Sequence, residues 1–261
     1  MHQLMSLYGL NRAAPRLFKA VKNEDNSEVT LYLYDMIVSD AMTAEWYGGG
    51  IDPLTFATEL ASITAGTIHL RINSPGGDVF AARAIEQALK EHPANIIAHI
   101  DGVAASAATY IALAANEVRM NDGAMFMIHN AWTWAAGDRN DLTKTATLLG
   151  KIDGTLAKTY ADKTGKTVDE ITKLMDAETW FTAQEALDYG FADLIDNGTD
   201  GDKKAAKNRA TWNMAIYKNA PVSQMPAPDS VPTPTPKQEP APLAVDRAAL
   251  LRRLDASVCD Y

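Results

Sequence analysis

A regular alternation of strand-like and helix-like segments constrains the fold of this chain more than any other feature. The strand patterns are short runs in which apolar residues alternate or follow one another, at residues 29–38, 67–73 and 95–100. Amphipathic helix patterns separate them, at residues 52–61 and 81–89. Because strands joined through helices connect by right-handed crossovers, we expect an α/β fold with a mostly parallel sheet. Ligands should then bind outside the carboxyl ends of the strands.

The second half of the domain continues this alternation with one exception. We expect a helix of small residues at 104–115, two short strands at 118–120 and 124–128, a helix at 167–175, a capped helix ending at Gly190 and a closing strand at 191–195. The exception is a long amphipathic pattern from Asp138 to about Lys163, which predicts a helix that stands away from the sheet.

Shifts in composition divide the chain into four parts. Residues 1–28 form an N-terminal arm with little pattern, and residues 29–196 form the α/β domain. Residues 197–242 are expected to be a linker, first polar and then Pro-rich, because eight of the twelve prolines lie between Pro221 and Pro242. Residues 243–261 predict a short amphipathic helix that could dock on a partner surface.

Charge and cysteine content exclude several classes of function. The chain has 24 Lys and Arg against 33 Asp and Glu, and no basic stripe interrupts its net charge of −9, so we expect neither nucleic acid nor membrane as a partner. Cys259 is the only cysteine, which excludes internal disulfides and multi-cysteine metal sites. We expect no metal or cofactor. No apolar run is long enough to span a bilayer, which predicts a cytoplasmic protein.

Ser106 is a candidate nucleophile at the start of the small-residue helix. A hydroxyl in the first turn lies beside unpaired N–H groups and the positive end of the helix dipole, which would stabilise an oxyanion on a substrate carbonyl. The Ala107 N–H is one candidate donor. The simpler interpretation is that small residues allow the helix to pack closely on the sheet, and this stretch by itself is compatible with both.

Other residues could complete such a site. His129 ends an apolar strand, where the backbone is held by the sheet while the imidazole remains accessible. Its near-neutral pKa would suit a general base for serine. The loop from Ser74 to Asp78 contains two glycines, which permit a backbone N–H to point into a cleft. Asp176 and Glu178, between two predicted elements, are candidates for the acid that orients the histidine. Each of these residues also has an ordinary structural interpretation.

The order of four motifs is more specific than any one of them. SPGGD at 74–78 precedes GVAASAA at 102–108, MIHN at 127–130 and an acid ahead of EALDYG at 185–190. In the order of these four motifs the chain resembles the ClpP family of serine peptidases and, within it, the shorter phage and prophage head maturation proteases.

The resemblance implies a role for each candidate. Ser106 would be the nucleophile, His129 the base, and Gly77 and Ala107 the donors of the oxyanion hole, with Ser74 and Gly76 beside the substrate. Glu178 falls where the family usually has aspartate, and Asp176 is close enough to compete with it.

The resemblance also implies an architecture and a biological role. The fold would be a ClpP/crotonase-like spiral with a projecting handle helix, assembled into homo-oligomeric rings that stack through the handles. The activity would be an ATP-independent serine endopeptidase that processes phage capsid or scaffold protein, in the bacterial host cytoplasm or inside the prohead. Two alternatives remain open at this stage: a crotonase-type acyl-CoA enzyme on the same fold, and a mainly structural capsid assembly factor.

Overall fold

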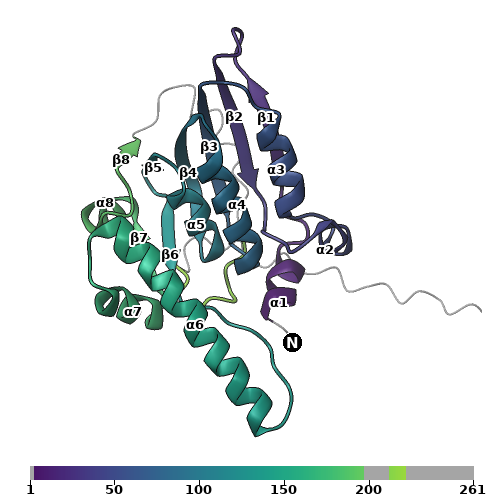
Figure 1. Ribbon diagram of the computed structural model, residues 1–261, viewed down its shortest axis with the longest axis vertical. Coiled ribbons are helices and arrows are strands. Elements are labelled where there is room, and N and C mark those ends of the chain that lie inside the picture. Colours follow the sequence, from purple (N-terminus) through teal and green to yellow (C-terminus); the bar gives the residue numbers. More distant parts are fainter. Residues whose placement is uncertain (1–2, 197–211, 222–261) are drawn as a thin grey trace, which may run out of the picture. The chain divides into compact units, whose positions relative to one another are not determined.

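The computed structural model describes residues 3–196 and 212–221. Within these residues the strands form one eight-stranded sheet in the order β1-β2-β3-β4-β5-β8, with β6 and β7 attached to the end of β4 (Figure 1). The strands are β1 (Leu17–Lys22), β2 (Glu28–Tyr34), β3 (Thr67–Ser74), β4 (Asn95–Ala105), β5 (Glu117–Asn121), β6 (Met125–Ile128), β7 (Thr179–Thr182) and β8 (Leu194–Asp196). Only the β1–β2 and β6–β7 pairs are antiparallel, so the prediction of a mostly parallel α/β sheet is confirmed.

The described residues also form helices. They are α1 (Gln3–Leu10), α2 (Ala41–Tyr47), α3 (Pro53–Ala61), α4 (Val79–Glu91), α5 (Ala107–Leu113), α6 (Arg139–Thr164), α7 (Val168–Asp176) and α8 (Ala183–Tyr189). In Figure 1, α3, α4 and α5 lie side by side against one face of the sheet. Every second residue of β3 from Ile68 to Ile72 is apolar, and the side chains of Ile68, Leu70 and Ile72 are fully buried. No helix of the described residues has the length and apolar character needed to cross a bilayer.

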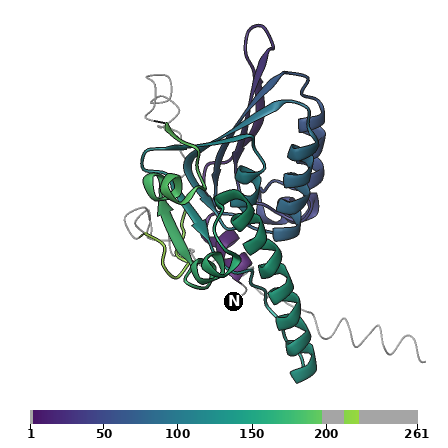
Figure 2. The same ribbon diagram turned by 60° about the vertical axis from the view of Figure 1, so that its left-hand side comes forward.

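The long helix α6 agrees with its predicted bounds and extends beyond the sheet (Figures 1 and 2). Asp138 caps its start by accepting hydrogen bonds from two backbone amides, and Gly165 ends it in the left-handed conformation. Its buried residues lie only in the C-terminal half, whereas Leu142 and Leu148 in the other half are about half exposed. The exposed half therefore presents apolar side chains away from the core of its own chain.

Strand β4 differs most from the expected elements. The sequence pattern predicts a strand that ends at Ile100 and a helix that begins at Ala104, but the strand runs to Ala105. Its first half pairs with β5 and its second half, from Val103 to Ala105, pairs with β6. Gly102 permits this continuation, because a Cβ there would lie 2.7 Å from the Asn73 Oδ1 atom that accepts the Val103 N–H. The sequence pattern could not reveal a strand that changes its partner.

Other segments, among them α1 and α2, are ordered in the structure although the sequence predicts no element there. β1 lies in the predicted N-terminal arm and pairs with β2, and β7 pairs with β6. Residues 212–221, which the sequence assigns to the linker, pack into the core with Trp212 and Tyr217 buried. The apolar residues of this short segment follow neither a helical nor a strand period, and it lies between a polar and a Pro-rich stretch, which is why the sequence assigns it to the linker. The amphipathic helix predicted for residues 243–261 lies outside the described residues.

Candidate active site

Ser106 lies at the sharp turn between β4 and α5. It is the N-cap residue of α5 with φ 53° and ψ −123°, a conformation that non-glycine residues rarely adopt. Its backbone N–H donates to the Met127 carbonyl of β6 at 2.9 Å, which holds the turn against the neighbouring strand. Ser106 therefore lies just before the helix rather than inside its first turn. The residue is buried, with 8% of its surface exposed.

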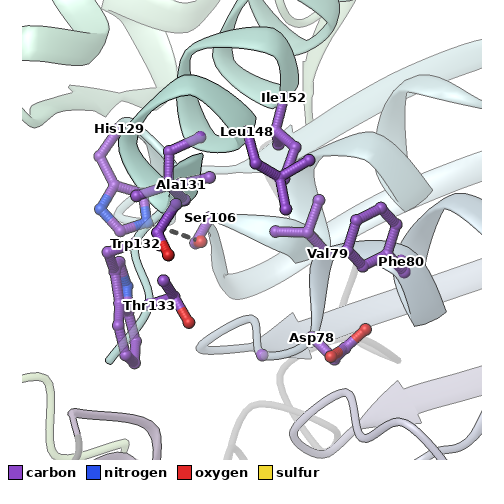
Figure 3. Close-up of a pocket in the computed structure, with 13 residues that line it drawn as sticks. Asp78, Val79, Phe80, Ser106, His129, Ala131, Trp132, Thr133, Leu148 and Ile152 are labelled. Atoms are coloured by element: carbon purple, nitrogen blue, oxygen red, sulfur yellow. Dashed lines mark hydrogen bonds between the residues drawn. The ribbon is translucent and has the colours of Figure 1, made fainter. Parts of the chain in front are cut away.

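His129 lies directly beyond the end of β6, and its ring reaches the serine. Its Nε2 atom is 2.7 Å from the Ser106 Oγ, a hydrogen-bond distance (Figure 3). The pairing of Ser106 with Met127 explains the proximity, because Met127 is only two residues from His129. Burial of the imidazole lowers its pKa to about 4, and the negative charge of Glu178 opposes that shift. The ring is thus a neutral imidazole at physiological pH.

Strand register brings Glu178 beside His129. β6 and β7 are antiparallel with Ile128 opposite Thr179, and the same register continued by one residue places Glu178 opposite His129. Glu178 is 9% exposed and has a positive φ of 50°. Within the described residues, Glu178 forms no direct hydrogen bond with the imidazole and acts on it through its charge. The Glu178 Oε1 instead accepts the Asn219 backbone N–H at 2.7 Å.

The competing acid, Asp176, has a different environment. It is exposed at the end of α7, and its Oδ1 accepts a hydrogen bond from the Asn130 side chain at 2.7 Å. The register that aligns Glu178 with His129 places Asp176 two residues further along, beyond the imidazole. Of the two acids, Glu178 is the one whose charge reaches the histidine.

The two candidate oxyanion donors belong to residues close to Ser106, because Gly77 lines the same pocket and Ala107 follows the serine in the chain. Gly77 forms a parallel bridge with Ile37, in which the flanking Gly76 carbonyl and Asp78 N–H bond to Ile37. In such a bridge the N–H of the central residue does not bond to the partner strand, which leaves it free of Ile37, and Gly77 lines the same pocket as Ser106. Ala107 is the first residue of α5, so its N–H has no acceptor within the helix.

The glycines of this loop permit a close approach. A Cβ on Gly76 would lie 2.5 Å from the Ala105 carbonyl oxygen and 3.1 Å from the Ala107 nitrogen. A Cβ on Gly77 would lie 2.0 Å from the Ile37 carbonyl oxygen, and both glycines have positive φ. Ser74 is fully buried, and its Oγ accepts the Gly76 N–H at 3.2 Å, so it supports the loop from within. The sequence predicts Ser74 beside the substrate, and the structure shows its hydroxyl in contact with the loop.

A pocket of about 290 Å³ opens beside Ser106 and His129 (Figure 3). Its apolar walls come from the start of α4 and from the middle of α6, which contribute Val79, Phe80, Leu148, Leu149 and Ile152. Trp132 and Thr133 line it from the segment after His129. In the described part of the chain, no cluster of three or more His, Cys, Asp or Glu side chains could hold a metal ion. The arrangement joins a hydroxyl and a neutral imidazole at an apolar pocket that Gly77 also lines, which is suited to acyl transfer.

Comparison with known proteins agrees with this geometry. The profile of the family described as Clp protease matches residues 36–198, more than half of the 261-residue chain. The chain is 36% identical to the ATP-dependent Clp protease proteolytic subunit 1 of Leifsonia xyli over 130 residues, which are 49% of this chain and 66% of that protein. It is 30% identical to subunit 2 of Tropheryma whipplei over 179 residues, which are 65% of this chain and 98% of that protein.

A solved structure shows the same relationship. A point mutant of ClpP1 from Listeria monocytogenes superimposes with a TM-score of 0.54 and 26% sequence identity, covering 68% of this chain and 95% of that chain. The alignment with the Leifsonia protein spans about two thirds of that relative's length. Residues 212–221 lie outside the match to the family profile. The extent of that match shows that the chain belongs to the Clp protease family.

Proposed function

We propose that this protein is a serine endopeptidase in which Ser106 is the nucleophile and His129 the general base. The observation that carries the proposal is the 2.7 Å contact between the Ser106 Oγ and the His129 Nε2 at the edge of a pocket. The neutral imidazole accepts the hydroxyl proton as Oγ attacks the scissile carbonyl, and then returns it to the departing amine. A water molecule, deprotonated by His129, then attacks the acyl-serine ester. The proton passes from His129 to the Ser106 Oγ as the acyl group leaves.

The Gly77 and Ala107 amides would hold the oxyanion of each tetrahedral intermediate. A substrate would lie extended beside the Gly76–Gly77 loop, pairing with exposed backbone as an added strand. The apolar lining from α4 and α6 would accept an apolar or aromatic side chain. Glu178, whose charge raises the pKa of His129, would stabilise the imidazolium that forms during attack.

We further propose that the enzyme is an ATP-independent, ring-forming peptidase that trims phage capsid or scaffold protein, in the host cytoplasm or inside the prohead. The order of the four motifs and the Pro-rich stretch after Pro221 support this proposal. The exposed apolar residues of α6 would join rings through their handles. The names of the relatives describe ATP-dependent subunits, so partnership with an ATPase is the main alternative.

The proposal is tested by labelling and by intact mass. A fluorophosphonate should modify the protein at one residue, which peptide mapping should identify as Ser106. Co-expression with a phage capsid protein should yield a shortened capsid protein, and the Ser106→Ala variant should yield the full-length protein. Truncation in both samples, or an unlabelled protein that still promotes capsid assembly, would support a structural assembly factor instead. Cleavage that requires an added unfoldase and ATP would contradict ATP independence.

The pH dependence of kcat/KM should reflect the buried histidine. Because burial lowers the pKa of His129 to about 4, the base stays deprotonated as the pH falls through 6.5, where an exposed histidine would be half protonated. We expect kcat/KM for a short peptide to remain near its plateau down to about pH 5 and to fall near pH 4. Circular dichroism at each pH would control for unfolding. A midpoint near pH 6.5 would contradict this prediction.

The Gly77→Ala substitution should disrupt the proposed oxyanion hole. The new Cβ would lie 2.0 Å from the Ile37 carbonyl oxygen at a φ of +148°, so the loop must shift and carry the Gly77 amide away. Loss of one oxyanion donor lowers kcat by about 10²-fold. Gly66→Ala is the matched control, because a Cβ there meets nothing within 4 Å. Peptide hydrolysis and the melting temperature of both variants check the prediction, and a kcat for Gly77→Ala within twofold of wild type would exclude this role.

A further inference from the structure

A segment that follows the α/β domain returns to the active site. The segment Trp212–Pro221, here called the return segment, lies outside the match to the family profile and is drawn in yellow-green in Figures 1 and 2. Three of its residues donate hydrogen bonds to elements around the site. Trp212 donates its indole N–H to the Asn73 carbonyl at 2.9 Å, Tyr217 its hydroxyl to the Pro75 carbonyl at 2.6 Å, and Asn219 its backbone N–H to Glu178.

The return segment is anchored by burial in the domain and by hydrogen bonds to Asn11. Trp212, Met214 and Tyr217 are buried in a cluster with residues of α1, of β6 and of the stretch after β2. Asn213 and Asn11 exchange two hydrogen bonds, in which the Asn213 N–H donates to the Asn11 Oδ1 at 2.6 Å and the Asn11 Nδ2 donates to the Asn213 carbonyl at 3.0 Å. These anchors hold the segment in place independently of a substrate.

Tyr217 connects the base with the glycine loop. Its ring meets the His129 imidazole edge to face, with centroids 5.4 Å apart and an interplanar angle of 82°. It also packs edge to face on Trp180 of β7, and its hydroxyl holds the carbonyl of Pro75, the residue before Gly76 and Gly77. One buried side chain thus restricts the imidazole and the loop that bears the Gly77 amide.

Asn219 holds the turn that contains the acid. Its backbone N–H donates to the Glu178 Oε1 at 2.7 Å, which fixes one carboxylate oxygen. Its Nδ2 donates to the Ala177 carbonyl at 2.7 Å and to the Glu178 carbonyl at 3.3 Å. Glu178 has φ 50°, a conformation that a glutamate keeps only when its surroundings hold it. Asn219 supplies such partners from outside the turn.

We infer that Tyr217 and Asn219 are positioning residues, through which the return segment holds His129, Glu178 and the glycine loop in their reactive arrangement. The inference rests on the proposed peptidase function and adds that catalytic competence depends on a segment beyond the region that matches the family. Small displacements of positioned groups lower the rate of the chemical step, whereas the substrate pocket, lined by other elements, should bind as before.

The experiment uses full-length chains and counts active sites. Tyr217→Phe removes only the hydroxyl, and Asn219→Pro removes the backbone donor. We expect kcat per fluorophosphonate-titrated site to fall by about 10-fold in the first variant and about 10²-fold in the second, with KM within about twofold of wild type. Asn219→Ala keeps the backbone N–H and should lose only about threefold. Asn213→Ala is the control, because its side chain contacts the Ala215 N–H and no residue of the site.

The outcomes separate positioning from folding. If Tyr217→Phe and Asn219→Pro reduce only the fraction of titratable sites, with kcat per site unchanged, the segment is merely structural and the inference is wrong. Equal losses for Asn219→Ala and Asn219→Pro would overturn the role of the backbone donor. If wild-type protein does not react with the fluorophosphonate at all, the proposed peptidase function fails first, before any variant is compared.

Discussion

The Ser106→Ala variant should lose peptide hydrolysis by about 10⁴-fold or more and should not react with a fluorophosphonate. The alanine has no hydroxyl, so no acyl-enzyme can form even with His129 and both amides in place. The fold should survive, because losing the hydrogen bond between the Oγ and His129 costs only about 1 kcal/mol. Initial rates, labelling and melting temperature together measure this result.

The matched control is Ser62→Ala at the end of α3. The Ser62 hydroxyl is exposed and donates to the Glu59 carbonyl, away from the pocket. The Ser62→Ala variant should retain wild-type activity and labelling. Hydrolysis at the wild-type rate by Ser106→Ala would remove Ser106 as the nucleophile, and binding of CoA thioesters by that active variant would favour the acyl-CoA alternative.

The Glu178→Gln variant should lower kcat by about 10³-fold, whereas Asp176→Asn should change it by less than about threefold. Both substitutions keep the size of the side chain and remove one negative charge. Only Glu178 is buried opposite His129 with its charge acting on the ring, so only its loss leaves the imidazolium without a counter-charge. Asp176 is exposed and bonded to the Asn130 side chain.

The pH profile adds a second measurement for these two variants. The charge of Glu178 raises the pKa of His129, so removing it should move the acidic limb of kcat/KM to still lower pH. Asp176→Asn should leave the limb where it is. A large loss of kcat with Asp176→Asn and a small one with Glu178→Gln would instead assign Asp176 as the orienting acid.

The sequence predicted the parts of the fold that local patterns encode. Periodic apolar residues and capping residues located α3, α4, α6 and the parallel strands that connect them, because these signals act over a few residues. It also singled out Ser106, at the predicted start of a small-residue helix, and His129, at the end of an apolar strand. It did not locate the end of β4 or the edge strand β1, because pairing with a distant strand determines both.

The amino-acid sequence by itself therefore determined the α/β class, the long helix and the identity of the candidate groups. Tertiary structure decided which of them meet. The antiparallel register of β6 and β7 places Glu178 rather than Asp176 opposite His129, and the positive φ of Ser106 directs its hydroxyl to the imidazole. The return segment joined the site only through burial of Trp212 and Tyr217 against distant residues. Such contacts depend on the packing of the whole domain, which no local pattern records.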